Sequence, residues 1–292
     1  MIIELLPFKK NVFFTVYMTP MLLLLSGSYS IDGICVGFVG LFIAYCLRLY
    51  KNNDKIKSKQ IIILTGLFIL SLFAKEMSYI CICLLLLLLP LKKIIKENKK
   101  TMLVATIIVA IVGMILATTI LLGSDTISDP RSEGTNAKEQ IEFLIKNPMS
   151  AVLIIINHIR DSLLNFDWLI YLCQVDFFGK ASCIFVLQVA FILYVSISDN
   201  SVKFNLKEKT ILLATFFGAY LTGSLMLYIS FTKVGKLSIN GYQPRYMFPI
   251  LPLLFMVINN DNKKTDKEQR EKISTVLAIF IMIGLVGSIS RL

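Results

Sequence analysis

The sequence predicts an all-α polytopic membrane protein: a helical bundle of about nine transmembrane helices with an additional external segment that is re-entrant or in-plane. Two observations predict this class. Apolar residues make up 56% of the 292 residues and the mean hydropathy is +0.73, which excludes a soluble globular domain. The apolar residues also gather into stretches that alternate with short basic loops, as in multi-pass membrane proteins. We expect a single integral-membrane domain over residues 1–292.

Nine apolar stretches are expected to be the spanning helices. They cover residues 11–27, 33–50, 60–74, 77–91, 101–123, 181–197, 209–230, 246–259 and 273–290. Several are shorter than the ~20 residues of a full span, but short segments cross where the bilayer thins or flanking side chains snorkel. Basic loops lie on both sides of the stretch 60–91, so the chain must form a hairpin that turns near Lys75 and Glu76.

The charge distribution predicts the orientation in the cell membrane. The net charge is +11, and most of the basic residues fall in short loops between apolar stretches, which is the positive-inside pattern rather than a nucleic-acid-binding surface. With Lys9 and Lys10 in the cytoplasm, nine spans place two thirds of the 30 lysines and arginines inside. The N-terminus is therefore expected to be cytoplasmic and the C-terminus external. The lipid bilayer, including its anionic lipids, is the partner that this charge implies.

Residues 123–180 are expected to form an external loop and interfacial helices. The polar segment 123–148 is either a solvated linker or a loop that folds over a cavity. The next stretch, 149–173, is apolar enough to span but carries His158, Arg160 and Asp161. If it crossed, every later loop would change sides and most of the downstream basic residues would lie outside. We therefore expect an in-plane or re-entrant helix pair on the outer face.

The remaining chemical motifs indicate neither a metal site nor a cofactor. The six cysteines lie almost entirely within apolar stretches and lack metal-ligand spacing, so we interpret them as small buried hydrophobic residues. The sequence contains no phosphate-binding glycine loop, zinc pattern or nucleophile elbow. A candidate site must therefore come from charged side chains at the ends of the spans.

The predicted topology gathers five such candidates on the outer face: Asp32, Lys75, Glu76, Tyr242 and Arg245. Cations beside aromatic rings and an acid suit an anionic, lipid-linked substrate, since lysine acts as a point charge and arginine as a bidentate fork for phosphate. Asp32 would then act as a catalytic base toward an acceptor hydroxyl, and the other four would bind substrate. The structural alternative is that the cations snorkel to lipid head groups and Asp32 caps a helix.

Three segments carry a resemblance to a known family. They are residues 20–32, which end in Ser-Tyr-Ser-Ile-Asp; residues 74–79, Ala-Lys-Glu-Met-Ser-Tyr; and residues 241–246, Gly-Tyr-Gln-Pro-Arg-Tyr. In order and spacing the sequence resembles the bacterial membrane family known as domain of unknown function 2142. The resemblance covers nearly the whole chain, including residues 139–148. One departure is Pro244, since the family's arginine usually follows Gln-Gly.

The family is similar to the GT-C glycosyltransferases, which take a sugar from a polyprenyl-phosphate donor at the outer face. The resemblance implies this activity here, in cell-envelope polysaccharide modification, with Asp32, Lys75, Tyr242 and Arg245 as matching positions. Family members usually begin with a further span and an external loop that carries an acidic residue. This sequence resembles the family from its middle onward. The resemblance therefore implies that a partner chain supplies the N-terminal part, or that the protein is inactive alone. The alternative function is a non-catalytic transporter or assembly factor for lipid-linked saccharides.

Overall fold

The described part of the chain is helical. The computed structural model describes residues 1–52, 56–75, 77–122, 134–165, 184–199 and 201–258, together with 272, 275–276 and 279. These residues form helices, turns and loops, and no β-strand occurs among them. The all-α prediction is therefore confirmed for the described residues.

The predicted span 11–27 is broken into two helices. The N-terminal elements are α1 (Ile2–Leu5), α2 (Lys10–Tyr17) and α3 (Pro20–Gly27). Thr19 has an extended backbone with φ −67° and ψ 148°, the conformation that a following proline imposes. Pro20 also lacks the N–H that would continue α2, and it starts α3 instead. Apolar composition concealed this break because apolar residues continue on both sides of it.

The predicted span 77–91 is a 3-10 helix rather than an α-helix. It follows α4 (Ile31–Lys51) and α5 (Ser58–Ala74) as η1 (Ile80–Leu88). A 3-10 helix rises ~2 Å per residue, so these residues cover ~18 Å. η1 packs closely on α12 (Leu206–Phe231), where a Cβ on Gly218 would lie 3.0 Å from the Cys81 Cβ. The missing side chain at position 218 therefore permits this close contact.

The middle of the chain contains one long peripheral helix and the external segment. Its elements are α6 (Leu91–Glu97), α7 (Lys99–Leu122), α8 (Ala137–Lys146), α9 (Pro148–His158) and the π-helix η4 (Ile159–Leu164). Asn136 caps α8 by accepting a hydrogen bond from the Glu139 backbone N–H at 3.2 Å. Gln140 of α8 is fully buried; its amide donates to the Tyr228 carbonyl oxygen at 3.2 Å and accepts from the Gly235 N–H at 3.0 Å. This part of the predicted external loop therefore packs against α12 and is not a solvated linker.

The predicted span 246–259 is also not a continuous helix. The C-terminal elements of the described chain are α11 (Ile184–Ser198), α12, the 3-10 turn η5 (Pro244–Met247) and α13 (Leu251–Met256). Pro249 and Pro252 interrupt this region, and each removes a backbone donor that an unbroken helix would need. Most of the predicted helix 273–290 and part of the stretch 149–173 lie outside the described residues.

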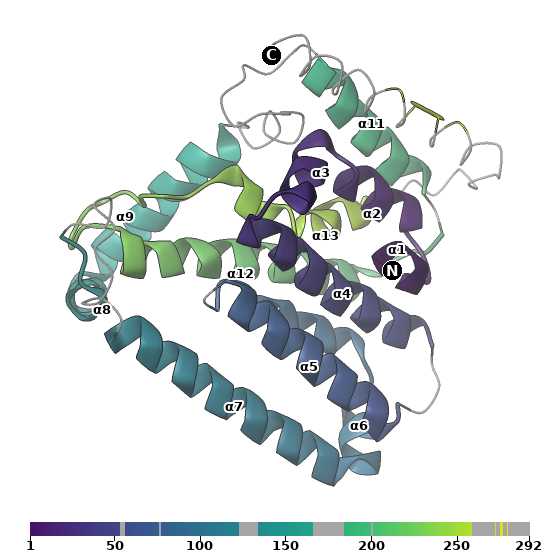
Figure 1. Ribbon diagram of the computed structural model, residues 1–292, viewed down its shortest axis with the longest axis horizontal. Helices are drawn as coiled ribbons and strands as arrows, with labels where there is room; N and C mark the ends of the chain where they lie inside the picture. The colour runs from purple at the N-terminus through teal and green to yellow at the C-terminus, as the bar shows by residue number, and fades with distance from the viewer. Residues whose placement is uncertain are drawn as a thin grey trace.

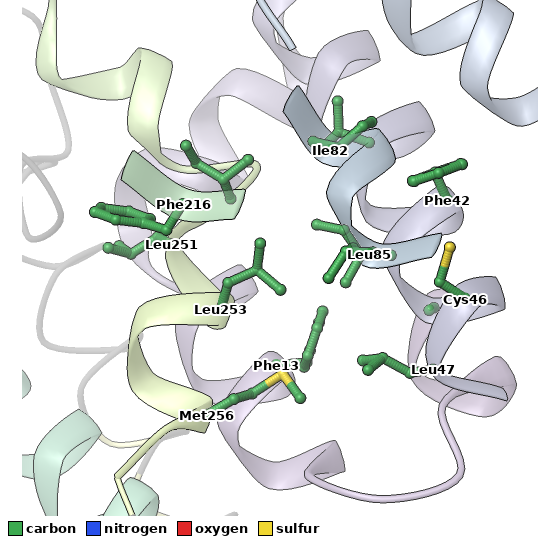
Figure 2. Packing of buried hydrophobic residues seen from close by; sticks show 14 of the residues in the cluster. Phe13, Phe42, Cys46, Leu47, Ile82, Leu85, Phe216, Leu251, Leu253 and Met256 are labelled. Atoms are coloured by element: carbon green, nitrogen blue, oxygen red, sulfur yellow. The ribbon is translucent and has the colours of Figure 1, made fainter. Parts of the chain in front are cut away.

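The apolar core forms around α13. Leu251, Leu253 and Met256 are fully buried, and Figure 2 shows Leu253 and Met256 on the side of α13 that faces Phe13 of α2 and Leu85 of η1. Dispersion contacts in such a core are individually weak and collectively large. The helix α13 is too short to be stable in isolation. Packing against several other elements therefore stabilises it.

Within the described residues, three helices are long and apolar enough to cross a membrane, namely α4, α7 and α12. The helices α5 and α11 are apolar but shorter. Figure 1 shows α7 at the periphery beside α5, with α8 near one of its ends. No residue in the apolar window of α7 is buried, against 56% of that of α4, so α7 presents a hydrocarbon-compatible surface. The total of nine crossings stays a prediction.

Loops predicted to share one side of the membrane meet in the fold. At one end, the Tyr50 hydroxyl donates to Glu208 at 2.6 Å and the Ser58 hydroxyl donates to Asn98 at 3.0 Å; all four were placed in cytoplasmic loops or at their edges. The loops predicted to be external meet at the other end, around the cavity described below. The grouping of the loops agrees with the predicted topology, while the assignment of one end to the cytoplasm stays a prediction.

Lys9 is fully buried although the sequence placed it in a cytoplasmic segment. Its ammonium donates to the backbone carbonyl oxygens of Asp199 and, at 3.3 Å, Ile258. Its backbone N–H donates to the Ser201 hydroxyl at 2.8 Å. Burial lowers the pKa of Lys9 to about 8. One side chain thus joins the N-terminus to the ends of α11 and α13.

We predict that Phe42→Ala lowers the free energy of unfolding by about 3–4 kcal/mol, because it removes a buried ring and leaves a cavity. Phe42 is 1% exposed and contacts the Phe68 ring at a centroid distance of 5.5 Å. Leu103→Ala is the control, since Leu103 of α7 is 61% exposed and its truncation should cost less than about 0.5 kcal/mol. Equilibrium unfolding in mixed micelles measures both, and equal losses would contradict the assignment of core and periphery.

Candidate functional site

Three charged side chains from separate segments meet at the predicted external end of the bundle. Asp32 lies in the first turn of α4, Lys75 follows the last residue of α5, and Arg245 belongs to η5. Ser30 caps α4 by accepting from the Asp32 N–H at 3.2 Å, which fixes the start of the helix. The helix end thereby positions the carboxylate where both cations can reach it.

The carboxylate is shared between the two cations. Asp32 Oδ1 lies 2.7 Å from Lys75 Nζ, and Asp32 Oδ2 lies 2.7 Å from Arg245 Nε. Asp32 is 5% exposed, and the side chains of Lys75 and Arg245 are 18% and 22% exposed. We call these three residues the charge cluster. Because charges removed from water need close partners, the three positions depend on one another.

Two further interactions hold the charge cluster in place. The Ser30 hydroxyl donates to Asp32 Oδ2 at 3.3 Å, and the N-terminus of α4 favours a negative charge in its first turn. Lys75 Nζ lies 3.1 Å from the centroid of the Tyr246 ring, a cation–π contact. The Tyr79 hydroxyl donates to the Tyr246 carbonyl oxygen at 2.9 Å, which ties that ring's segment to η1.

Burial lowers the pKa of the Lys75 ammonium, and the adjacent Asp32 carboxylate opposes this shift. Loss of the carboxylate would therefore leave the desolvation of Lys75 uncompensated. The positive charge of Lys75 thus depends on Asp32 as well as on solvent.

The charge cluster lines a cavity of about 840 Å³. Its described wall comes from the starts of α4 and η1, the ends of α5 and α12, and residues 241–246. The apolar part of the wall includes Ile31, Phe73, Met226, Leu227 and Phe231. Two cations and one carboxylate are the charged residues of the described wall, which therefore carries one net positive charge. A cavity of this size with a few polar groups on an apolar wall is typical of ligand sites.

Tyr242 also lines the cavity, and its approach depends on a glycine. Gly241 has a φ of +76°, and a Cβ there would lie 2.5 Å from Phe231 Cδ1. A side chain at position 241 would push the loop away from α12. The hydroxyl of Tyr242 and the Oε1 of Gln243 are buried without a hydrogen-bond partner among the described residues. Such groups are uncommon in folded proteins, since each costs about 1–3 kcal/mol.

Four of the five predicted site residues thus line one cavity: Asp32, Lys75, Tyr242 and Arg245. Glu76 lies outside the described residues. The structural alternative for Asp32 is partly realised, because Asp32 does lie in a helix's first turn, but Ser30 is the capping residue. The catalytic and binding roles of these residues stay predictions. Within the described chain, no three His, Cys, Asp or Glu side chains lie close enough together to hold a metal ion.

The structure adds His158, which the sequence placed in the external segment without a role. Its imidazole is 6% exposed and lies edge-on to the Tyr242 ring, with centroids 4.6 Å apart. Burial lowers the pKa of His158 to about 4, opposed by the nearby Asp161 carboxylate. Because His158 and Tyr242 lie far apart in the sequence, no local sequence pattern predicts their contact.

We predict that Asp32→Asn lowers the free energy of unfolding by about 2 kcal/mol, because it leaves two poorly solvated cations without their carboxylate. The control is Asp161→Asn, which breaks the exposed pair between Arg160 and Asp161 and should leave the melting temperature in detergent unchanged. Thermal unfolding followed by circular dichroism measures both. A melting temperature for Asp32→Asn equal to that of the unmodified protein would contradict the structural role of the shared carboxylate.

A second prediction concerns acid stability. The pKa of His158 is lower in the folded protein than the ordinary 6.5, so the unfolded chain binds the proton more readily. Above pH 6.5 His158 is neutral in both the folded and the unfolded chain, so it does not affect the free energy of unfolding. As the pH drops from 6.5 toward 4, the unfolded chain takes up the proton first, and the free energy of unfolding falls. Between pH 6.5 and pH 5 we expect a loss of about 1–2 kcal/mol. His158→Gln should remove this part of the pH dependence, and an identical slope for both proteins would refute the assignment.

Comparison with known proteins agrees with the resemblance noted from the sequence. The family model described as "Predicted membrane protein (DUF2142)" matches residues 1–254. No curated protein matches the chain, and no solved structure does. The matched region covers most of the chain and includes Asp32, Lys75, Tyr242 and Arg245. The chain therefore belongs to the DUF2142 family of membrane proteins.

Proposed function

We propose that this protein binds a polyprenyl-phosphate-linked sugar in the cavity and acts as a GT-C-like glycosyltransferase in cell-envelope polysaccharide modification. The observation that carries the proposal is the charge cluster, in which two cations and one carboxylate are the charged residues of the described cavity wall. The resemblance stated from the sequence supplies the reaction class. The two cations of the charge cluster are the reason for expecting an anionic donor.

The charge count supports a ligand with one negative charge. A sugar joined to a polyprenol through a single phosphate is a phosphodiester, which carries one negative charge at neutral pH. The charges of Asp32, Lys75 and Arg245 in the described cavity wall sum to +1, so a singly charged anion would neutralise these three residues. Lys75 would act as a point charge and Arg245 as a planar donor to the phosphate oxygens.

The apolar wall supports a ligand with a hydrocarbon part. Phe73 is 54% exposed and Ile31 is 55% exposed, and both line the cavity. Met226 and Leu227 of the apolar helix α12 line it as well. An isoprenoid chain covering these side chains would gain roughly 25 cal/mol for each Å² of apolar surface removed from water.

The proposed role of Asp32 as a catalytic base depends on the phosphate. In the ligand-free arrangement each carboxylate oxygen is paired with a cation at 2.7 Å, so neither oxygen is available to an acceptor hydroxyl. A phosphate that takes over part of the bonding to Lys75 and Arg245 would release one carboxylate oxygen for the acceptor hydroxyl. Tyr242 and Glu76 are the further proposed substrate contacts.

The proposed location of the chemistry is the outer face of the cell membrane. In the nine-crossing topology, with the N-terminus in the cytoplasm and the C-terminus outside, the loops that carry Asp32, Lys75 and Arg245 are all external. A polyprenyl-linked sugar presented at that face would reach the cavity from the bilayer.

The test is binding and transfer with purified protein in nanodiscs. Lys75→Ala together with Arg245→Ala should weaken binding of a radiolabelled polyprenyl-phosphate sugar by at least about 30-fold, since each charged contact contributes about 1.5–3 kcal/mol. Lys233→Ala together with Lys236→Ala is the matched control, because it removes the same charge from the same predicted face of the membrane without touching the described cavity wall. The control should bind like the unmodified protein.

The outcomes separate the function classes. Sugar transfer to a saccharide acceptor that disappears in the Lys75 and Arg245 double variant supports the glycosyltransferase. Binding without transfer, alone and with a co-expressed partner chain, would favour a non-catalytic assembly factor. Unchanged binding in the double variant would overturn the proposed site.

A further inference from the structure

The ring of Tyr242 is placed at the cavity by its neighbours rather than by its own hydroxyl. That hydroxyl has no hydrogen-bond partner among the described residues, and the preceding Gly241 gives the backbone a conformation that most residues avoid. The Tyr246 ring packs edge-on at a centroid distance of 5.8 Å, and the Tyr220 ring does the same at 5.8 Å. The nearest ring is that of His158, at 4.6 Å.

The His158 ring is itself held from two sides. It stacks on Tyr220 of α12 with a centroid distance of 5.3 Å and an interplanar angle of 13°. Its Nε2 lies 2.7 Å from the Ser224 hydroxyl oxygen. The Ser224 hydroxyl donates to the Tyr220 carbonyl oxygen at 2.8 Å, so its oxygen is left to accept from the imidazole N–H. Tyr220 and Ser224 lie four residues apart, which places both on one face of α12.

The π-helix η4 adds the third support. Ser162 donates to the His158 carbonyl oxygen at 2.6 Å, and its oxygen lies 2.5 Å from the Tyr220 hydroxyl. Tyr220 therefore donates to Ser162, which closes a bridge between η4 and α12. π-Helical turns are rare and often mark functional sites. Here the turn begins directly after His158.

We infer that His158 is a positioning residue, which with Ser162, Tyr220 and Ser224 fixes the ring of Tyr242 in the wall of the cavity. The effect of His158 on ligand binding rests on the proposed function. The fixed position of the Tyr242 ring does not, because it is a property of the ligand-free protein. The network makes the external helix α9 part of the site. Neutral histidine suits this role, since burial favours the uncharged imidazole, whose N–H still donates a hydrogen bond and whose ring still stacks.

The experiment measures the Tyr242 ring directly, in the full-length protein in detergent without ligand. Site-specific 3-fluorotyrosine at position 242 reports its surroundings through the fluorine resonance. His158→Phe keeps a ring but removes the hydrogen bond. Ser224→Ala removes the nearer hydroxyl partner of Nε2, at 2.7 Å, and leaves the Ser162 hydroxyl at 3.3 Å. We expect one sharp line in the unmodified protein and a shifted line, broadened at least about twofold, in both variants, because the ring samples more than one position.

The control is Ser196→Ala. Ser196 is buried and donates to the carbonyl oxygen four residues earlier, as Ser224 does, but it lies on α11 and does not line the cavity. Its spectrum should match that of the unmodified protein. If Ser224→Ala also gives an unchanged fluorine line, the positioning role is overturned.

A binding measurement separates this inference from the proposed function. Polyprenyl-phosphate sugar should bind about tenfold more weakly to Ser224→Ala than to Ser196→Ala. If the unmodified protein does not bind that lipid while the fluorine line still changes in the variants, the proposed function fails and the positioning role stands. If the lipid binds equally to both serine variants while the fluorine line changes, Tyr242 is fixed by His158 but its position does not serve the ligand, and that part of the inference is refuted.

Discussion

The carboxylate of Asp32 is the point on which the cavity depends, because it supplies the charge partner of two cations from distant segments. Lys75 ends α5 and Arg245 lies in η5, and each approaches one oxygen of Asp32 at 2.7 Å. A buried charge without a partner is strongly unfavourable, so the starts and ends of these elements are constrained together. The same arrangement leaves one net positive charge in the described cavity wall, so the residues that stabilise the fold are also those that would meet the proposed anionic ligand.

The charged part of this site was predictable because the short loops predicted to be external contain few ionisable residues. Asp32, Lys75 and Arg245 stood out against a hydrophobic background, and the grouping of loops by side brought them to one end. Their distances were not predictable, and neither was the sharing of one carboxylate. His158 was missed as a site residue, since its contacts with Tyr220 and Tyr242 join positions far apart in the chain.

The helical class also followed from composition, whereas the type of helix did not. A hydropathy pattern records how apolar a segment is, and it does not distinguish an α-helix from the 3-10 helix η1. The break before Pro20 had a visible signal, because proline lacks a backbone donor. The interruption around Pro249 and Pro252 had the same signal. The close packing at Gly218 depends on contacts with η1 that no local pattern contains.

The position of Lys9 has a consequence for the order in which the protein is made. Its carbonyl partners at Asp199 and Ile258 lie 190 and 249 residues further along the chain. During synthesis, Lys9 therefore leaves the ribosome long before either partner exists, and its ammonium must stay hydrated at the membrane surface. Closure of the N-terminal helices over α11 and α13 is then a late event in biogenesis, after nearly all of the described chain has been translated.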